Sequence, residues 1–255
     1  MEIELRGVSK RYGATAALNA IDLSIPAART TALIGPSGCG KSTLLRLLVG
    51  LVEPDAGEIR YDAAPLRTLD LTALRRRMGY VIQEGGLFPH LTAAENATLM
   101  ARPLRWPAPR TRARLDELVA LTRFPAEALD RYPTELSGGQ RQRVSLMRAL
   151  LLDPDVVLLD EPLGALDPLG RAELRDDLGR IFHAVGKTAV LVTHDVAEAA
   201  ILGDVVVVMR DGRVVQRGPF AELAAAPADA FVAAFLTSSP AAGAASLRAP
   251  TGGGA

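Results

Sequence analysis

The residues with the clearest chemical purpose lie in the segment 35–43, whose sequence is GPSGCGKST. It follows the pattern G-x-x-x-x-G-K-[ST], in which a glycine-rich loop turns its backbone N–H groups toward the phosphates of a nucleotide. Lys41 can neutralise phosphate charge, and the Ser42 hydroxyl can ligate Mg²⁺. We therefore expect a site for a nucleotide and Mg²⁺ that is formed by Gly35, Pro36, Ser37, Gly38, Cys39, Gly40, Lys41, Ser42 and Thr43.

The neighbours of this loop suit the same purpose. An apolar run at 30–34 predicts a buried strand before it, and leucines at helical spacing predict a helix after it. The start of that helix carries roughly half a positive charge, which adds to the attraction for phosphate. A thiol beside a helix N-terminus can act as a redox switch. We instead interpret Cys39 as a small filler whose backbone N–H does the binding.

Two acidic residues and a histidine follow other apolar runs. Asp160 ends a predicted buried strand, where its carboxylate can hold Mg²⁺ through the water shell of the ion. Glu161 can accept a proton from an attacking water or orient it, and His194, after the next strand, can contact the γ-phosphate. Acidic residues at strand ends also serve as helix caps, and a lone histidine is usually structural. The shared context favours nucleotide hydrolysis. The three histidines are too scattered for a Cys/His metal site.

A second glycine-rich element begins another predicted helix, with the sequence LSGGQ at 136–140. A serine followed by two glycines leaves backbone N–H groups bare, which suits an anion. The residues involved are Ser137, Gly138, Gly139 and Gln140. One nucleotide does not need two such elements from one chain.

Elsewhere, short apolar runs at 30–34, 156–159, 188–192 and 205–209 alternate with helical patterns such as 170–185. This predicts an α/β fold with a mostly parallel core sheet. Period-two alternation at 3–8 and 18–25 predicts an N-terminal antiparallel layer. Prolines break the helices of 85–153, which we interpret as a helical subdomain inserted between core halves 1–84 and 154–237. The small, polar residues of 238–255 predict a disordered tail.

The composition limits the function classes. The 29 Lys and Arg balance 29 Asp and Glu, so no net charge attracts nucleic acid, and we interpret the arginine clusters at 75–77 and 110–114 as solvated helix faces. The single cysteine fits a reducing compartment. The apolar runs are shorter than the roughly 18 residues of a membrane span. We expect a cytoplasmic protein that serves a membrane only through a partner.

The order of these motifs resembles that of ATP-binding cassette (ABC) proteins over residues 1–237. The resemblance includes Gln83 in YVIQEGG, LSGGQ, DEP and GALD. It implies a P-loop NTPase fold that hydrolyses ATP with Mg²⁺. It also implies a dimer, most simply of identical chains, in which Ser137 to Gln140 of one cassette cap the ATP bound by the other.

Further roles follow from the same resemblance. Tyr12 would stack on adenine. Gln83 would join Ser42 and Asp160 near Mg²⁺ and the attacking water, while its loop senses a membrane partner. Asp167, in GALD, would run along the dimer interface and couple the two sites.

Within the family, the segments 75–99 and 191–218 resemble ATPases of binding-protein-dependent importers, above all those for glycine betaine, choline and related osmoprotectants. The expected partners are therefore transmembrane permease subunits and, indirectly, a substrate-binding protein, with the chain peripheral on the inner membrane face. Residues 87–90 are expected to dock a permease loop, although Leu87 and Phe88 could equally be core. Because only a short tail follows Leu236, we expect no C-terminal regulatory module.

Other functions fit the sequence less well. An importer ATPase for an amino acid or a sulfonate is a close alternative, since the cassette barely contacts the solute in this family. An exporter remains open. A soluble ABC protein acting on ribosomes or DNA would need a second cassette or a coiled-coil arm, and a P-loop kinase would have no use for LSGGQ or Glu161.

Overall fold

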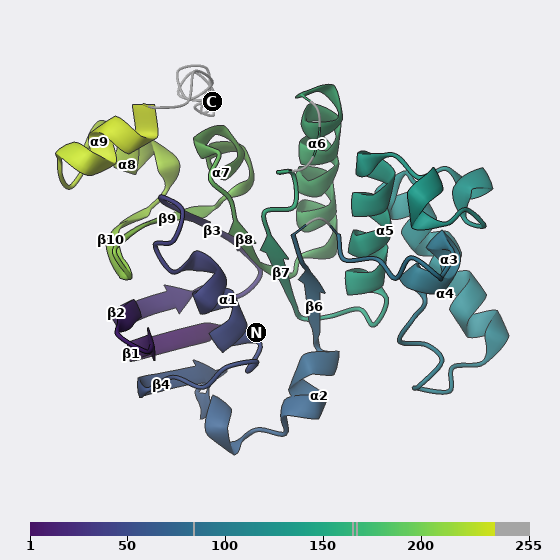
Figure 1. Ribbon diagram of the computed structural model, residues 1–255, viewed down its shortest axis with the longest axis horizontal. Helices are drawn as coiled ribbons and strands as arrows, with labels where there is room; N and C mark the ends of the chain where they lie inside the picture. Colours follow the sequence, from purple (N-terminus) through teal and green to yellow (C-terminus); the bar gives the residue numbers. More distant parts are fainter. Residues whose placement is uncertain (84, 165, 167, 238–255) are drawn as a thin grey trace, which may run out of the picture.

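The computed structural model describes residues 1–83, 85–164, 166 and 168–237. Two β-sheets and the helices around them make up this part of the chain (Figure 1). The tail predicted at 238–255 and the predicted coupling residue Asp167 lie outside the described residues.

The larger sheet has six strands in the order β10-β9-β3-β8-β7-β6. Their bounds are β3 (Thr30–Ile34), β6 (Met78–Val81), β7 (Val156–Asp160), β8 (Thr188–Val192), β9 (Val205–Arg210) and β10 (Arg213–Gly218). All neighbours are parallel except β9 and β10. Strands β3, β7 and β8 are buried along their whole length, as their mostly apolar sequences predict. The four core strands predicted from the sequence are confirmed.

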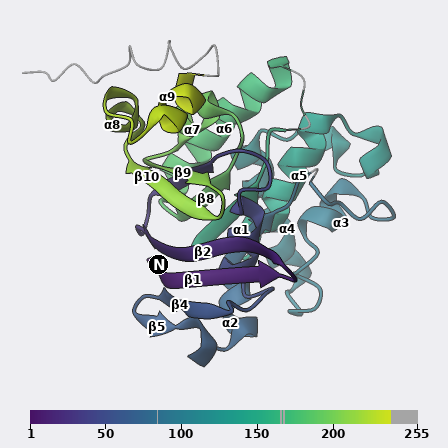
Figure 2. The ribbon, with the colours of Figure 1, turned by 60° about the vertical axis from the view of Figure 1, so that its left-hand side comes forward.

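The smaller sheet is antiparallel, with the order β2-β1-β4-β5. It consists of β1 (Ile3–Tyr12), β2 (Thr15–Ile25), β4 (Ala56–Tyr61) and β5 (Ala64–Pro65). This confirms the predicted N-terminal layer and adds β4 and β5 to it. Its strand β2 lies beside the β9–β10 hairpin, where the Asn19 amide donates a 2.8 Å hydrogen bond to the Gly212 carbonyl (Figure 2).

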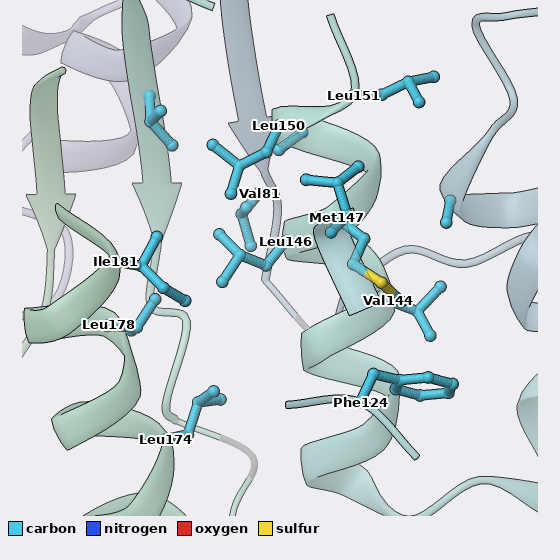
Figure 3. Close-up of a cluster of buried hydrophobic side chains, with 14 of the residues drawn as sticks. Val81, Phe124, Val144, Leu146, Met147, Leu150, Leu151, Leu174, Leu178 and Ile181 are labelled. Carbon is cyan, nitrogen blue, oxygen red and sulfur yellow. The ribbon is translucent and has the colours of Figure 1, made fainter. Parts of the chain in front are cut away.

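Helices cover both faces of the larger sheet. Alternate residues of β7 point to opposite faces of the sheet. On one face, Val156 and Leu158 pack with the leucines of α1 (Lys41–Leu48). Val157 and Leu159 pack with α5 (Gly138–Leu150) and α6 (Pro168–Val185). Figure 3 shows this second cluster, with apolar side chains of α5 and α6 meeting near β6. The helix after the phosphate loop and the helix after LSGGQ thus lie on opposite faces of one sheet.

The remaining helices have between five and 15 residues. They are α2 (Leu71–Arg76), α3 (Ala93–Ala97), α4 (Ala108–Thr122), α7 (Val196–Leu202), α8 (Phe220–Ala225) and α9 (Ala230–Thr237), with 3₁₀ turns at Leu66–Thr68, Ala126–Ala128 and Pro133–Glu135. Helices α3, α4 and α5 gather at one end of the molecule, all within the predicted helical segment (Figure 1). None of the helices described here has the length and apolar character to cross a membrane.

A buried carboxylate joins three of these helices. The Asp177 side chain, on α6, is 5% exposed and forms ion pairs with Arg143 of α5, with Arg180 and, at 3.7 Å, with Arg123. Arg143 also donates a hydrogen bond to the Thr122 carbonyl at the end of α4. Because one guanidinium bridges α4 and α6, the orientation of α5 is fixed relative to both.

The predicted solvated arginines are only partly so. Arg75, Arg76 and Arg77 are exposed, as expected. For Arg114 the prediction of a solvated side chain is wrong. Arg114 is half-buried and donates hydrogen bonds to the carbonyls of Leu150 and Leu151. An arginine stem covers apolar surface readily while its fork seeks helix-end carbonyls, so a charged run on a helix does not exclude structural contacts.

Candidate nucleotide site

The phosphate loop joins β3 to α1 by a backbone path that only glycine follows well. Gly35, Gly38 and Gly40 have φ angles of 149°, 78° and 106°. A Cβ on Gly35 would lie 2.1 Å from the Met209 carbonyl oxygen, and one on Gly40 would lie 2.5 Å from that of Ala17. The loop therefore folds tightly against neighbouring backbone, which leaves no room for a side chain at Gly35 or Gly40.

Lys41 is buried at the start of α1. Its ammonium group donates hydrogen bonds to the carbonyls of Gly35, at 2.8 Å, and Pro36, at 3.0 Å. The lysine thus curls back over its own loop, which places its charge at the mouth of the cradle. Burial raises the pKa of the neighbouring Cys39 thiol. A thiol that resists ionisation suits the filler interpretation better than a redox switch.

Two oxygen ligands meet where α1 faces β7. The Ser42 hydroxyl donates a 3.1 Å hydrogen bond to Oδ1 of Asp160. Burial raises the pKa of Asp160, and burial together with the Asp160 charge raises the pKa of Tyr80 to about 12. A buried carboxylate whose ionised form is disfavoured would be stabilised by a cation beside it.

This pair of ligands fits Mg²⁺. The ion prefers hydroxyl and carboxylate oxygens and keeps several waters or takes phosphate oxygens, so two protein ligands suffice. The described residues contain no group of three His, Cys, Asp or Glu side chains that could hold a metal by themselves. Ser42 and Asp160 would be the residues that hold Mg²⁺, with Gln83 as the third predicted ligand.

Glu161 and His194 face each other across two strand ends. Asp160 pairs with Val192 in the parallel β7–β8 ladder, so the residues after both strands emerge at the same sheet edge. His194 Nδ1 lies 3.4 Å from Glu161 Oε2. Glu161 has a positive φ of 48°, and its amide donates to the Val192 carbonyl at 2.9 Å. A left-handed conformation is uncommon for a non-glycine residue and concentrates at functional sites.

Gln83 follows β6, the next strand of the sheet. Val81 pairs with Leu159, so Gln83 also emerges at the edge that carries Asp160. Its side chain is exposed, in a turn where the Gly85 amide donates to the Ile82 carbonyl at 3.1 Å. Four of the predicted residues, Ser42, Gln83, Asp160 and Glu161, thus come from three elements to one edge.

Tyr12 lies at the end of β1 and is 46% exposed. The Lys10 ammonium group lies over the Tyr12 ring, 5.8 Å from the ring centroid. An exposed ring on the strand layer beside the phosphate loop can stack on a base, as the resemblance implies.

The LSGGQ element forms the N-terminus of α5 and is stabilised by a capping box. Ser137 caps α5: its hydroxyl accepts from the Gln140 amide at 3.2 Å, and Gln140 Oε1 accepts from the Ser137 amide at 2.9 Å. Around Gly139, a Cβ would meet nothing within 4 Å. Since α5 and α1 cover opposite faces of the sheet, this element and the phosphate loop of the same chain are not brought together.

The predicted docking segment divides in two. Leu87 packs against the core, whereas Phe88 and His90 are exposed and meet edge to face, with ring centroids 6.0 Å apart. The exposed part of the predicted docking segment is therefore Phe88–His90.

Sequence reasoning missed two residues that hold the turn of His194. The Thr193 hydroxyl donates a 2.5 Å hydrogen bond to Glu198 Oε2 and accepts from the Asp195 amide at 3.0 Å. Glu198 is buried in the first turn of α7, and burial raises its pKa. The available signal was the spacing: a threonine directly before the histidine and an acid four residues after it.

Comparison with known proteins agrees with the motifs. Residues 18–164 match a family model described as ABC transporter. The chain is 46% identical over 234 residues to the glycine betaine uptake system ATP-binding protein YehX of Escherichia coli (strain K12), over 92% of this chain and 76% of that protein. It is 43% identical over 235 residues to the glycine betaine/carnitine/choline transport ATP-binding protein OpuCA of Bacillus subtilis (strain 168). That match covers 92% of this chain but 62% of the relative, less than two thirds of its length.

A solved structure supports the fold. The bacterial ABC transporter cassette MJ0796, solved as a dimer, matches with a TM-score of 0.77 and 34% identity, over 86% of this chain and 98% of the cassette. The predicted α/β fold, with its parallel core and antiparallel N-terminal layer, is confirmed.

Proposed function

The chain belongs to the ABC transporter family, and from this we propose that it is an ATPase subunit whose hydrolysis of ATP drives a solute across a membrane. The observation that carries the proposal is the meeting of Ser42, Asp160, Glu161 and His194 at one sheet edge beside a preformed phosphate loop. ATP is the substrate, and Mg²⁺ would neutralise phosphate charge when bound.

Each residue has a part in this reaction. The backbone amides of 35–43 and the Lys41 ammonium bind the phosphates, and Ser42, Asp160 and Gln83 hold the metal. Glu161, whose carboxylate lies 3.4 Å from His194, orients the attacking water and accepts its proton. His194 positions the γ-phosphate from the other strand end, and Tyr12 stacks on the base.

Hydrolysis requires two chains. The start of α5 lies on the face of the sheet opposite to α1, and the Ser137–Gln140 cap leaves the Gly138 and Gly139 amides available, so this end serves the phosphates of a second copy. A cassette solved as a dimer, similar over most of this chain, supports this arrangement. Asp167 would couple the two sites.

The membrane partners are permease subunits, contacted through Phe88 and His90, and through them a substrate-binding protein. The chain would be peripheral on the inner face of the membrane. The core 1–84 and 154–237 would bind nucleotide, and the helical subdomain 85–153 would carry the docking surface.

The proposed solute is an osmoprotectant such as glycine betaine or choline. The relatives named above transport glycine betaine, carnitine or choline according to their names. Since the cassette does not contact the solute, an importer of an amino acid or a sulfonate is the second candidate.

Two experiments test these proposals separately. Purified Ser137→Arg chain should bind ATP like the parent but lose hydrolysis, and mixing it with Lys41→Ala chain should restore one intact site. Normal hydrolysis by monomeric Ser137→Arg chain would refute the shared site.

For the solute, labelled glycine betaine uptake is measured in cells lacking this chain, with and without added salt. Rescue by the wild type but not by Glu161→Gln supports the proposed solute class. No rescue by the wild type, while the chain with its permease hydrolyses ATP, removes the osmoprotectant assignment alone.

A further inference from the structure

Arg148, on the last turns of α5, reaches out of the helix to a loop far away in sequence. Its guanidinium donates hydrogen bonds to the carbonyl oxygens of Gly86, at 2.9 Å, and Gly85, at 2.8 Å. Burial lowers the pKa of Arg148. A planar fork that grips two successive carbonyls fixes both their distance and their direction, which a single hydrogen bond cannot do.

The gripped carbonyls belong to the turn that carries Gln83. The Gly85 amide closes this turn on Ile82, and Gly85 and Gly86 have φ angles of 76° and 51°. A Cβ on Gly86 would lie 2.1 Å from Ile82 Cδ1, so the Ile82 side chain packs over Gly86. Arg148 therefore holds the end of the Gln83 turn in place.

The next residues of this segment are held by α3. Asn96 is fully buried; it accepts from the Phe88 amide at 2.8 Å and donates to the carbonyls of Phe88, Leu91 and Thr92. The exposed Phe88 therefore stands on a frame formed by Arg148 at one end and Asn96 at the other. Since α3 packs on α5, both ends of this frame rest on α5.

The other end of α5 is the LSGGQ element. Ten residues separate Gly138 from Arg148, which is about 15 Å along the helix axis. The helix between them is packed on both α4 and α6, and Arg143 fixes it through Asp177. It is a rigid link between the amides at its start and the turn of Gln83.

Two further polar side chains of α5 lie beneath the Gln83 turn. Gln142 Nε2 and Ser145 Oγ are buried and, in the described part of the chain, have no hydrogen-bond partner. Both residues lie under Gly85, whose Cβ would be 3.5 Å from Gln142 Oε1 and 3.6 Å from Ser145 Cβ. Buried polar atoms without partners are rare, and these two lie where the turn meets the helix.

We propose that Arg148 is the positioning residue through which α5, on closing over the ATP of the second copy, sets the Gln83 turn and the Phe88 surface of its own chain. This rests on the proposed function, because it needs the LSGGQ element to bind the nucleotide of a partner. Arg148 acts through its two hydrogen bonds to the turn and is a positioning residue, not a catalytic one. Through Arg148, binding of the second copy's ATP by the LSGGQ element sets the conformation of the Gln83 turn and the Phe88 surface.

The test is amide hydrogen exchange on the full chain in the Glu161→Gln background, without nucleotide and with ATP and Mg²⁺. The variants are Arg148→Lys, which keeps the charge but loses the fork, and Arg148→Gln. The matched controls are Arg114→Lys and Arg114→Gln, because Arg114 also donates to two successive carbonyls, those of Leu150 and Leu151, away from the Gln83 turn. Melting temperatures are recorded for all four.

In the parent and both controls, ATP should slow exchange about fivefold or more in peptides covering 134–150 and 82–92. In the Arg148 variants the slowing in 134–150 should persist, while that in 82–92 falls below about twofold. A purely structural role would instead raise exchange throughout α5 even without ATP, and that result would overturn the proposal.

The other outcomes are equally distinct. If the Arg148 variants respond in 82–92 as the Arg114 variants do, the proposal is wrong while the shared site stands. If the parent shows no ATP-dependent protection at 134–150, the shared site itself is wrong and this coupling with it.

Discussion

Ser42 on α1 donates a 3.1 Å hydrogen bond to Asp160 at the end of β7, which joins the two predicted metal ligands directly. Ser42→Ala removes one ligand and leaves the Asp160 carboxylate without this donor. The Mg²⁺ concentration at half-maximal ATP binding should therefore rise about tenfold or more. Nucleotide binding titrated with Mg²⁺ measures this. ATP binding in excess EDTA is the control and should be equal in both proteins; an unchanged Mg²⁺ dependence would remove Ser42 from the metal site.

Glu161→Gln should separate binding from turnover. The amide keeps the size of the side chain near His194 but cannot accept a proton from water. Phosphate release should fall by a factor on the order of 10² or more, with ATP affinity within about twofold of wild type. Rapid quench kinetics and equilibrium nucleotide binding give the two numbers. A variant that retained half of the wild-type rate would show that another group activates the water.

Much of the core could be predicted because its signal is local. A strand buried on both faces must be mostly apolar, as β3, β7, β8 and β9 are, and their bounds follow the sequence closely. Strand β6 has only four residues and includes Gly79. A Cβ on Gly79 would lie 2.5 Å from the Ala149 carbonyl oxygen, so α5 packs closely on this strand only because residue 79 is a glycine. Such a strand is defined by its neighbours rather than by its own residues.

The same distinction holds in the site. The phosphate loop and LSGGQ are contiguous patterns, so their residues could be named from the sequence. Arg148 and Glu198 could not, because the roles of both depend on partners that folding brings to them. An arginine in an amphipathic helix is typical of a solvated face, and only the fold brings it to Gly85 and Gly86. A buried glutamate is likewise indistinguishable from a helix-start acid until Thr193 is seen to donate to it.

Glu198 should make stability depend on pH. Burial raises its pKa above the ordinary 4.5, with Asp195 adding to the rise and Thr193, Arg171 and His194 opposing it. The folded chain therefore binds this proton more tightly than the unfolded chain. Its contribution to stability is complete below pH 4.5 and is lost as the pH rises through the folded pKa.

Glu198→Gln removes this titration while its amide oxygen can still accept from Thr193. The stability of the variant relative to wild type should therefore increase as the pH rises from 4.5 toward neutrality. Urea unfolding of both proteins across that range measures the difference. Glu222→Gln, in the first turn of α8, is the matched control because that glutamate is exposed. A difference that stayed constant with pH would mean that Glu198 keeps its ordinary pKa.

Asp177 and Asp176 are neighbours on α6 with opposite surroundings. The Asp177 side chain is 5% exposed among three arginines, whereas that of Asp176 is 67% exposed and meets only Arg175, at 3.3 Å, among the ion pairs of the described residues. Asp177→Ala would strand the Arg143 guanidinium, which is itself 14% exposed and cannot turn to water as Arg180 can. The free energy of unfolding should fall by about 3 kcal/mol for Asp177→Ala and by less than about 0.5 kcal/mol for Asp176→Ala. Urea denaturation compares them. Equal losses would mean that the network does not hold α5, and that the link between LSGGQ and the Gln83 turn is held by apolar packing alone.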